Sequence, residues 1–274
     1  LRGETNMIQT KKIGSLEYLT AEDISVPHAF TTRFGGVSTG FRSSMNLAVS
    51  RGDSEENVRE NLRILTAALD MDMEKLVLTR QTHSDIVRVV TEADCNGPFH
   101  RDYPECDALV TNTPGVTLMV FTADCTPVLL HDPITGAVGA VHAGWRGTAA
   151  SIAGKAVAAM VREFGSDPSQ LRAAIGPNIG VCCFETDSDV PKAMAEAFGK
   201  EAKPFIFSKE NKYYVNLKEV NALWLRDCGV ENIHINPLCT ACRTEHHVDR
   251  GGSERRDHRN HHKEKHTAAK ASAD

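Results

Sequence analysis

The sequence lacks the features of a membrane, secreted or nucleic-acid-binding protein. No apolar run approaches the roughly 20 residues that cross a bilayer, and residues 1–16 contain no apolar core of a secretory signal. The formal net charge of -5 gives no electrostatic basis for binding nucleic acid. We therefore expect a cytoplasmic protein that binds neither membranes nor nucleic acids.

The cysteines do not form the framework of a small disulfide-rich domain. Eight of them are scattered through 274 residues without a secretion signal, so reduced thiols are expected, with one or two serving a metal. This length is ample for a buried core. No internal repeat divides the chain.

Strand and helix patterns alternate along the chain, which favours a mixed sheet covered by helices over a purely parallel one. Asp53 or Ser54 can cap a helix whose apolar residues recur every three or four positions to Leu69. The other expected helices are 148–164, 191–198 and 217–227. The expected strands are 28–33, 75–79, 85–91, 115–121, 127–131, 137–141, 171–175 and, as the last, 231–235.

The composition changes after Cys242. Residues 243–274 have no aromatic side chain, almost nothing large and apolar, and six of the twelve histidines. Such a segment buries too little surface to offset its ordering entropy, so we expect a disordered tail. Residues 1–15 are expected to form an extension, and 16–242 the domain.

Three segments place reactive residues at strand ends. They contain His83, Cys125 and His142. Two imidazoles and a thiolate suit zinc or copper, and three ligands leave one position open for catalysis. Zinc lowers the pKa of bound water to about 7. Taken singly, a histidine at a strand end more often forms a hydrogen bond or faces solvent, and a cysteine after a buried strand is more often a small core residue.

Six motifs in a fixed order resemble the laccase-domain family, also called polyphenol-oxidase-type or multicopper-oxidase-type purine nucleoside phosphorylases. The resemblance spans about residues 30–242. The motifs are TTRFGGVS (31–38), QTH (81–83), CDAL (106–109), ADCTPV (123–128), HAGWRGT (142–148) and AIGP (174–177).

The resemblance implies the metal ligands His83, Cys125 and His142 and a single-domain α/β/β/α sandwich with a mixed sheet. It also implies phosphorolysis of adenosine, inosine, guanosine and methylthioadenosine, and deamination of adenosine. Zinc is the expected metal, with copper possible. Purine nucleosides and phosphate are the expected partners of a monomer or weak homodimer. A zinc hydroxide attacking C6 of adenine accounts for deamination; phosphorolysis has no comparable explanation.

Three further polar residues are candidates for the site. Arg33, beside a Gly-Gly turn, is consistent with phosphate binding or with an ion pair. Asp124 precedes Cys125 and suits ligand orientation, proton transfer or a turn cap. Arg146 either lines the pocket or packs the junction between strand and helix.

Two cysteine pairs lie outside these motifs. Cys239 and Cys242 form a single Cys-x-x-Cys, followed by His246 and His247, and one pair without a second is weak support for zinc. In the family that the chain resembles, this segment is not the metal site. Cys182 and Cys183 are expected to be ordinary thiols.

The chain departs from the family pattern after Cys242. The final apolar strand and its basic residues are replaced by the polar tail, so we expect a missing strand, an exposed sheet edge and the loss of an arginine near the substrate. Two enzyme alternatives remain. One is a copper-dependent polyphenol oxidase, which a single mononuclear site suits poorly. The other is a cysteine hydrolase with Cys125 as nucleophile and His142 as base. A vestigial binding protein is the non-catalytic alternative.

Overall fold

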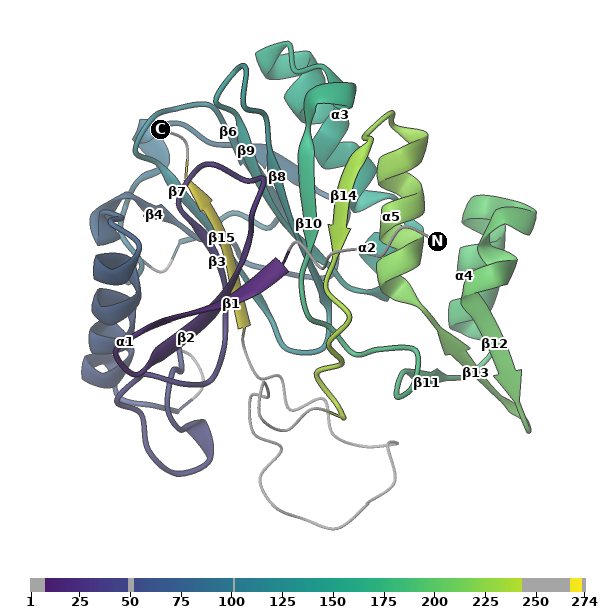
Figure 1. The fold of residues 1–274 in the computed structure, drawn as a ribbon, viewed down its shortest axis with the longest axis horizontal. Coiled ribbons are helices and arrows are strands. Elements are labelled where there is room, and N and C mark those ends of the chain that lie inside the picture. The colour runs from purple at the N-terminus through teal and green to yellow at the C-terminus, as the bar shows by residue number, and fades with distance from the viewer. Residues whose placement is uncertain (1–7, 49–51, 101, 243–266, 273–274) are drawn as a thin grey trace.

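The computed structural model describes residues 8–48, 52–100, 102–242 and 267–272. Its centre is formed by two six-stranded sheets that lie face to face (Figure 1). In spatial order the first sheet contains β1 (Ile8–Ile13), β2 (Leu16–Ala21), β3 (His28–Thr31), β15 (Thr267–Ser272), β7 (Thr117–Thr122) and β4 (Leu76–Val77). The second contains β14 (Asn232–Ile235), β10 (Arg172–Ile175), β8 (Thr126–His131), β9 (Val138–Ala143), β6 (Ala108–Thr111) and β5 (Val87–Val89).

Helices cover the outer faces of both sheets. The helix α1 lies on the first sheet, and α3 and α5 lie on the second (Figure 1). A small third sheet packs beside α4. The helices are α1 (Glu55–Ala68), α2 (Trp145–Ala149), α3 (Ile152–Phe164), α4 (Asp189–Phe198) and α5 (Leu217–Asp227), and the strands of the small sheet are β11 (Glu185–Thr186), β13 (Lys212–Val215) and β12 (Ile206–Lys209).

Alternation along the strands builds three apolar layers. On β7, Leu118 joins the cluster between the two sheets, whereas its neighbour Met119 packs with Leu62 and Leu65 of α1. This is the period of two expected for a strand buried on both faces. The result is the predicted single-domain α/β/β/α sandwich with mixed sheets, which is therefore confirmed.

The first predicted helix boundary is correct, because Ser54 caps α1 by accepting a hydrogen bond from the Asn57 amide. The predicted helix 148–164 is instead two helices, α2 and α3, separated by Ser151 with φ 61°. The Trp224 indole N–H donates to the Thr148 carbonyl at 2.7 Å. This contact uses the carbonyl that a continuous helix would offer to residue 152.

The tail differs from the expectation at Thr267–Ser272. This segment forms β15, which lies between β3 and β7 and is antiparallel to both. The final strand is therefore present, and the prediction that its absence exposes a sheet edge is wrong. Central strands are held through backbone pairing on both sides, which does not require large apolar side chains. The rest of the tail prediction, residues 243–266 and 273–274, lies outside the described residues.

The N-terminal boundary also differs. Residues 8–13 were expected in an extension, but they form β1, which pairs with β2 from Ile8 opposite Ala21 to Ile13 opposite Leu16. The first sheet therefore begins before residue 16. Among the residues that the structure describes, no helix has the length and apolar character needed to traverse a bilayer.

Candidate metal centre

The three predicted ligands come together where the two sheets are joined. His83 lies in the loop after β4, Cys125 lies between β7 and β8, and His142 is on β9. Their donor atoms lie within 4.8 Å of one another, and Cys125 Sγ is 3.7 Å from His83 Nε2. The two imidazole rings meet edge to face with centroids 4.9 Å apart. Cys125 and His142 follow His83 by 42 and 59 positions in the sequence, and the fold brings the three residues into one cluster.

Strand direction explains this convergence. Both β3 and β7 are antiparallel to β15, and β4 is parallel to β7, so β3, β4 and β7 all end at one edge of the first sheet. Arg33, His83 and Cys125 follow these three ends. His142 reaches the same place because β8 begins directly after Cys125 and pairs with β9, with Pro127 opposite His142.

Gln81 fixes the loop that carries His83. Its side-chain amide donates to the Phe121 carbonyl at 2.6 Å, and its amide oxygen accepts from the Phe121 N–H at 2.7 Å. One side chain thereby makes both hydrogen bonds of a strand pair with β7. This contact gives a structural reason for glutamine in the Gln-Thr-His motif.

Asp107 organises two of the three ligands and was not singled out from the sequence. It is fully buried just before β6. Its carboxylate accepts five hydrogen bonds, from the amides of Thr82, His83 and Ser84, the Ser84 hydroxyl and His142 Nδ1 at 2.7 Å. The amide contacts hold His83 at a φ of 59°, where a non-glycine residue is otherwise strained. The sequence feature that could have pointed to Asp107 is its position directly before an apolar strand in the CDAL motif.

The cluster carries separated charges. Burial raises the pKa of Cys125, but hydrogen bonds from His142 and His83 outweigh it and lower the pKa to about 7. Burial likewise lowers the pKa of His142, and the hydrogen bonds with Asp107 and Cys125 raise it to about 9. Asp107 is held to a pKa of about 2 by its donors despite burial. Without a metal, these opposite pKa shifts favour a thiolate on Cys125 and a protonated ring on His142.

The donor set fits a zinc or copper ion. Asp107 takes Nδ1 of His142, which leaves Nε2 of that ring to face the other donors. A carboxylate behind a ligating histidine is the usual support of zinc-bound imidazole. Gly144 keeps the space open, because a Cβ there would lie 2.7 Å from His83 Cδ2 and 3.3 Å from Cys125 Sγ.

Asp124 lies beside the cluster but is engaged elsewhere. Its Oδ1 accepts a hydrogen bond from the Thr240 hydroxyl at 2.7 Å, and its backbone carbonyl accepts from the Ile179 N–H. It therefore ties the link carrying Cys125 to two later segments of the chain. A catalytic role for Asp124 stays a prediction.

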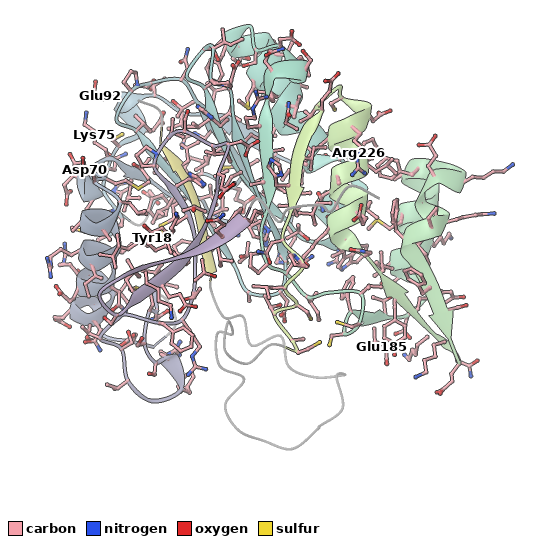
Figure 2. All side chains as sticks on the ribbon, viewed as in Figure 1. Tyr18, Asp70, Lys75, Glu92, Glu185 and Arg226 are labelled. Carbon is pink, nitrogen blue, oxygen red and sulfur yellow. The ribbon has the colours of Figure 1, made fainter. Side chains whose placement is uncertain are left out.

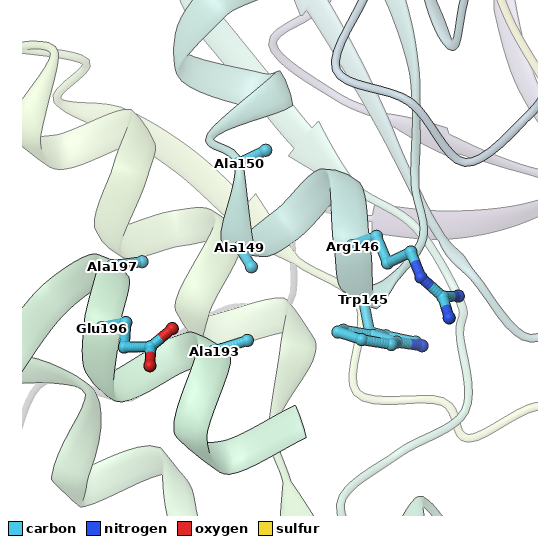
Figure 3. Close-up of a pocket in the computed structure, with 7 residues that line it drawn as sticks. All are labelled: Trp145, Arg146, Ala149, Ala150, Ala193, Glu196 and Ala197. Carbon is cyan, nitrogen blue, oxygen red and sulfur yellow. The ribbon is translucent and has the colours of Figure 1, made fainter. Parts of the chain in front are cut away.

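The two arginines occupy different surroundings. Arg33 is half-buried at the sheet edge where the ligands gather, with its guanidinium 5.6 Å from the Phe34 ring. Arg146 is exposed and stacks on Trp145 at 4.3 Å. Figure 3 shows the Trp145 ring facing Ala193 and Glu196 of α4, whereas the Arg146 guanidinium points away from them. The groove that these residues line has a volume of about 360 Å³. Substrate binding by either arginine stays a prediction.

Asp107→Asn is expected to weaken metal binding about 10–100-fold, the usual effect of losing a carboxylate behind a ligating histidine. An amide cannot accept from every donor that the carboxylate serves, so unfolding free energy should also fall by about 2–4 kcal/mol. Asp132→Asn is the matched control, because Asp132 is equally buried but serves the turn after β8. Titration with a zinc chelator distinguishes the two: equal zinc affinity in both variants would reduce Asp107 to a purely structural residue.

Comparison with known proteins agrees with this architecture. The sequence profile of the family described as multi-copper polyphenol oxidoreductase laccase matches residues 27–259. A Deinococcus radiodurans protein named purine nucleoside phosphorylase is 38% identical over 82% of this chain and 84% of its own length. Another relative, purine nucleoside phosphorylase YlmD of Geobacillus stearothermophilus, is 37% identical over 81% of the chain and 84% of its own.

Solved structures give the same result. The crystal structure of YlmD from Geobacillus stearothermophilus superposes with a TM-score of 0.86 and 29% identity, covering 98% of this chain and 99% of the other. The hypothetical protein YfiH of Bacillus licheniformis superposes with a TM-score of 0.87 and 31% identity, covering 98% and 100%. The chain therefore belongs to the multi-copper polyphenol oxidoreductase laccase family, whose curated relatives here are named purine nucleoside phosphorylases.

Proposed function

We propose that this chain is a zinc-dependent purine nucleoside phosphorylase that also deaminates adenosine. The observation that carries the proposal is the His83–Cys125–His142 cluster, held from behind by Asp107, in a chain 38% identical to a protein named purine nucleoside phosphorylase. Adenosine, inosine, guanosine and methylthioadenosine are the proposed substrates. Eight free cysteines fit the proposed cytoplasmic location.

We assign some residues of the site to binding and others to proton transfer. Bound zinc would supply Lewis acidity and activate water at neutral pH. Asp107 fixes the tautomer and orientation of His142. Arg33 offers a planar fork of donors that suits phosphate, at the sheet edge where the ligands gather. Asp124, next to Cys125, is our candidate for moving a proton to or from the purine.

Product analysis from adenosine tests the proposal. In phosphorolysis a phosphate oxygen bonds to C1′ as the glycosidic bond breaks, giving adenine and ribose 1-phosphate only when phosphate is present. In deamination water replaces the amino group at C6, giving inosine and ammonia with or without phosphate. Chromatography should show both product sets with zinc-loaded protein. The absence of all of them would overturn the proposal.

The family description also suggests a copper oxidase. Laccase chemistry needs several coppers to reduce dioxygen fully. Among the described residues, two groups could hold a metal, and the His83 cluster is the one that contains imidazole. We therefore favour the nucleoside enzyme. Several coppers per chain together with turnover of phenols would favour the oxidase.

A second candidate function has one specific observation in its favour. Cys125 Sγ lies within 4.8 Å of a ring nitrogen of His142, whose Nδ1 is hydrogen-bonded to Asp107, so the three residues follow the order nucleophile, base and orienting carboxylate. This arrangement is shared by cysteine hydrolases. The two functions differ in whether the Cys125 thiolate is free or bound to a metal in the working protein.

Alkylation of Cys125 distinguishes them. In metal-stripped protein, reaction with iodoacetamide should rise with pH around a midpoint of about 7, because the lowered pKa makes Cys125 a thiolate above that value. Cys95, half-buried with a raised pKa, serves as the slow internal control. Zinc should protect Cys125 by at least about tenfold, since ligated thiolate reacts poorly. Equal reactivity with and without zinc would favour the hydrolase.

A further inference from the structure

Four cysteines converge away from the His83 cluster. Cys182 and Cys183 lie in the turn before β11, and Cys239 and Cys242 lie after β14. Their four sulfur atoms lie within 4.8 Å of one another. Yellow sulfur atoms are visible next to the labelled Glu185, where the two segments meet (Figure 2). The second pair that the Cys-x-x-Cys motif lacked in the sequence is thus supplied by the fold.

The spacing suits a metal better than a disulfide. Cys242 Sγ lies 3.2 Å from Cys182 Sγ and 3.1 Å from Cys183 Sγ, and all four thiols are free. One disulfide would join two of the sulfurs and leave two thiols beside it. A tetrahedral zinc ion with Zn–S bonds of about 2.3 Å separates its sulfurs by about 3.8 Å, which a small adjustment of these side chains provides.

Backbone amides already point at one of the sulfurs. The Gly180 N–H donates to Cys239 Sγ at 3.1 Å, and the Ala241 N–H donates to the same atom at 3.3 Å. Such N–H donors stabilise negative charge on sulfur. Gly180 also permits the close approach, because a Cβ there would lie 3.0 Å from Cys239 Cβ and 3.3 Å from Cys182 Sγ.

A buried cation balances the charge that the site would carry. Lys218 of α5 is 5% exposed, and its ammonium donates to the Asn236 and Leu238 carbonyls at 2.6 Å each. Those carbonyls are neutral, whereas Lys218 interacts electrostatically with Cys239 and Cys182. Burial lowers the pKa of Lys218 to about 8, and negative charge on the nearby sulfurs opposes that shift and stabilises the ammonium form. Zinc with four thiolates carries a net charge of -2 and supplies this negative charge.

We propose that Cys182, Cys183, Cys239 and Cys242 form a second, structural zinc site. All four ligands come from the protein, so the site is closed and differs from the open His83 cluster. The inference is independent of the nucleoside activity proposed above. Loss of this site is measurable by metal content whether or not the enzyme acts on nucleosides.

The position of the site indicates what it does. It joins the loop after β10 to the segment after β14, where the Thr240 amide donates to the Asn178 carbonyl. Thr240 then holds Asp124, the neighbour of Cys125. Zinc at the four cysteines therefore clamps the segment that positions the link between β7 and β8. Its removal should lower the melting temperature by on the order of 5–10 °C.

Elemental analysis of full-length protein loaded with Zn²⁺ and then dialysed tests the proposal. Wild type should retain about two zinc ions per chain, whereas Cys239→Ser/Cys242→Ser and His83→Ala/Cys125→Ala should each retain about one. Cys95→Ser/Cys228→Ser is the matched control, because it removes two half-buried thiols outside both clusters and should retain about two.

A measurement that leaves all four cysteines of the proposed site intact covers the case in which Cys239→Ser/Cys242→Ser does not fold. In the His83→Ala/Cys125→Ala background, Co²⁺ should give charge-transfer absorption typical of four thiolates, about four times that of a one-thiolate site. Zinc should protect the four cysteines from alkylation until a chelator removes it. About one zinc in wild type together with no cobalt–thiolate band in this background overturns the proposal. A disulfide within the cluster in protein prepared with reductant does so as well.

Discussion

His83→Ala is expected to lose the metal of the His83 cluster and to lower kcat/KM for nucleosides at least about a thousandfold, equivalent to about 4 kcal/mol of transition-state stabilisation. Two ligands remain, Cys125 and His142, and two donors hold zinc far more weakly than three. His83 is half-buried in a loop, so the fold should survive. The checks are zinc content, circular dichroism and steady-state kinetics on adenosine with saturating phosphate.

His100→Ala is the matched control. His100 is exposed, and its ring contacts Tyr103 at 6.0 Å. This variant should keep both the metal and the activity of wild type. If His83→Ala loses the metal but retains activity, the metal is not needed for the reaction, and a hydrolase with Cys125 as nucleophile is favoured. A variant that keeps full metal affinity would remove His83 from the ligand set.

Most of the fold follows from local patterns in the sequence. Apolar residues spaced three or four apart predict α1, and runs of apolar residues predict β7, β8 and β9. Both patterns are visible in the sequence because these residues are the ones that pack into the apolar layers. The small sheet of β11, β12 and β13 was not anticipated, because two of its strands are partly exposed and show no clean alternation. The break between α2 and α3 was missed for another reason: a tertiary hydrogen bond from Trp224 competes with helix continuation.

The candidate site was predictable only in part. His83, Cys125 and His142 stood out because reactive side chains followed strand ends inside recognisable motifs, and the structure brings them together. Asp107 did not stand out, since its importance lies in five hydrogen bonds that exist only after β4, β6 and β9 are in place. Likewise, no spacing rule relates Cys182 to Cys242 before the chain is folded.

The β15 segment shows the limit of composition. Alanine and lysine are depleted in strands, and they make up four of the six residues of this segment, which lies in a polar tail whose composition suggests disorder. Pairing with two neighbours overrides this propensity, because a strand slot between β3 and β7 offers backbone donors and acceptors on both sides. The strands that β15 pairs with, β3 and β7, lie more than 140 positions earlier in the sequence, so the local composition of the tail does not predict the pairing.

A chain that ends at residue 266 is therefore expected to lose most of its stability. The truncation removes β15, which makes three register pairs with β3 and six with β7, and leaves both neighbours with unpaired backbone groups inside the first sheet. At about 0.5–1.5 kcal/mol for each net hydrogen bond, the loss is on the order of 5 kcal/mol or more. This equals much of the 5–15 kcal/mol that holds a typical domain folded.

A chain that ends at Ser272 is the control, because it keeps β15 and removes residues 273–274 only. Thermal unfolding and the soluble fraction after expression should separate the two truncations by on the order of 10 °C and several-fold, respectively. Ala269→Pro should act like the longer truncation, since Ala269 lies opposite both Phe30 and Val120, and proline removes a backbone donor there. Equal melting temperatures for all three chains would mean that β3 and β7 are held together without β15. Arg33 follows the end of β3, and Cys125 follows the end of β7. Because β15 pairs with both strands, it also sets the distance between Arg33, which is proposed to bind phosphate, and the His83 cluster.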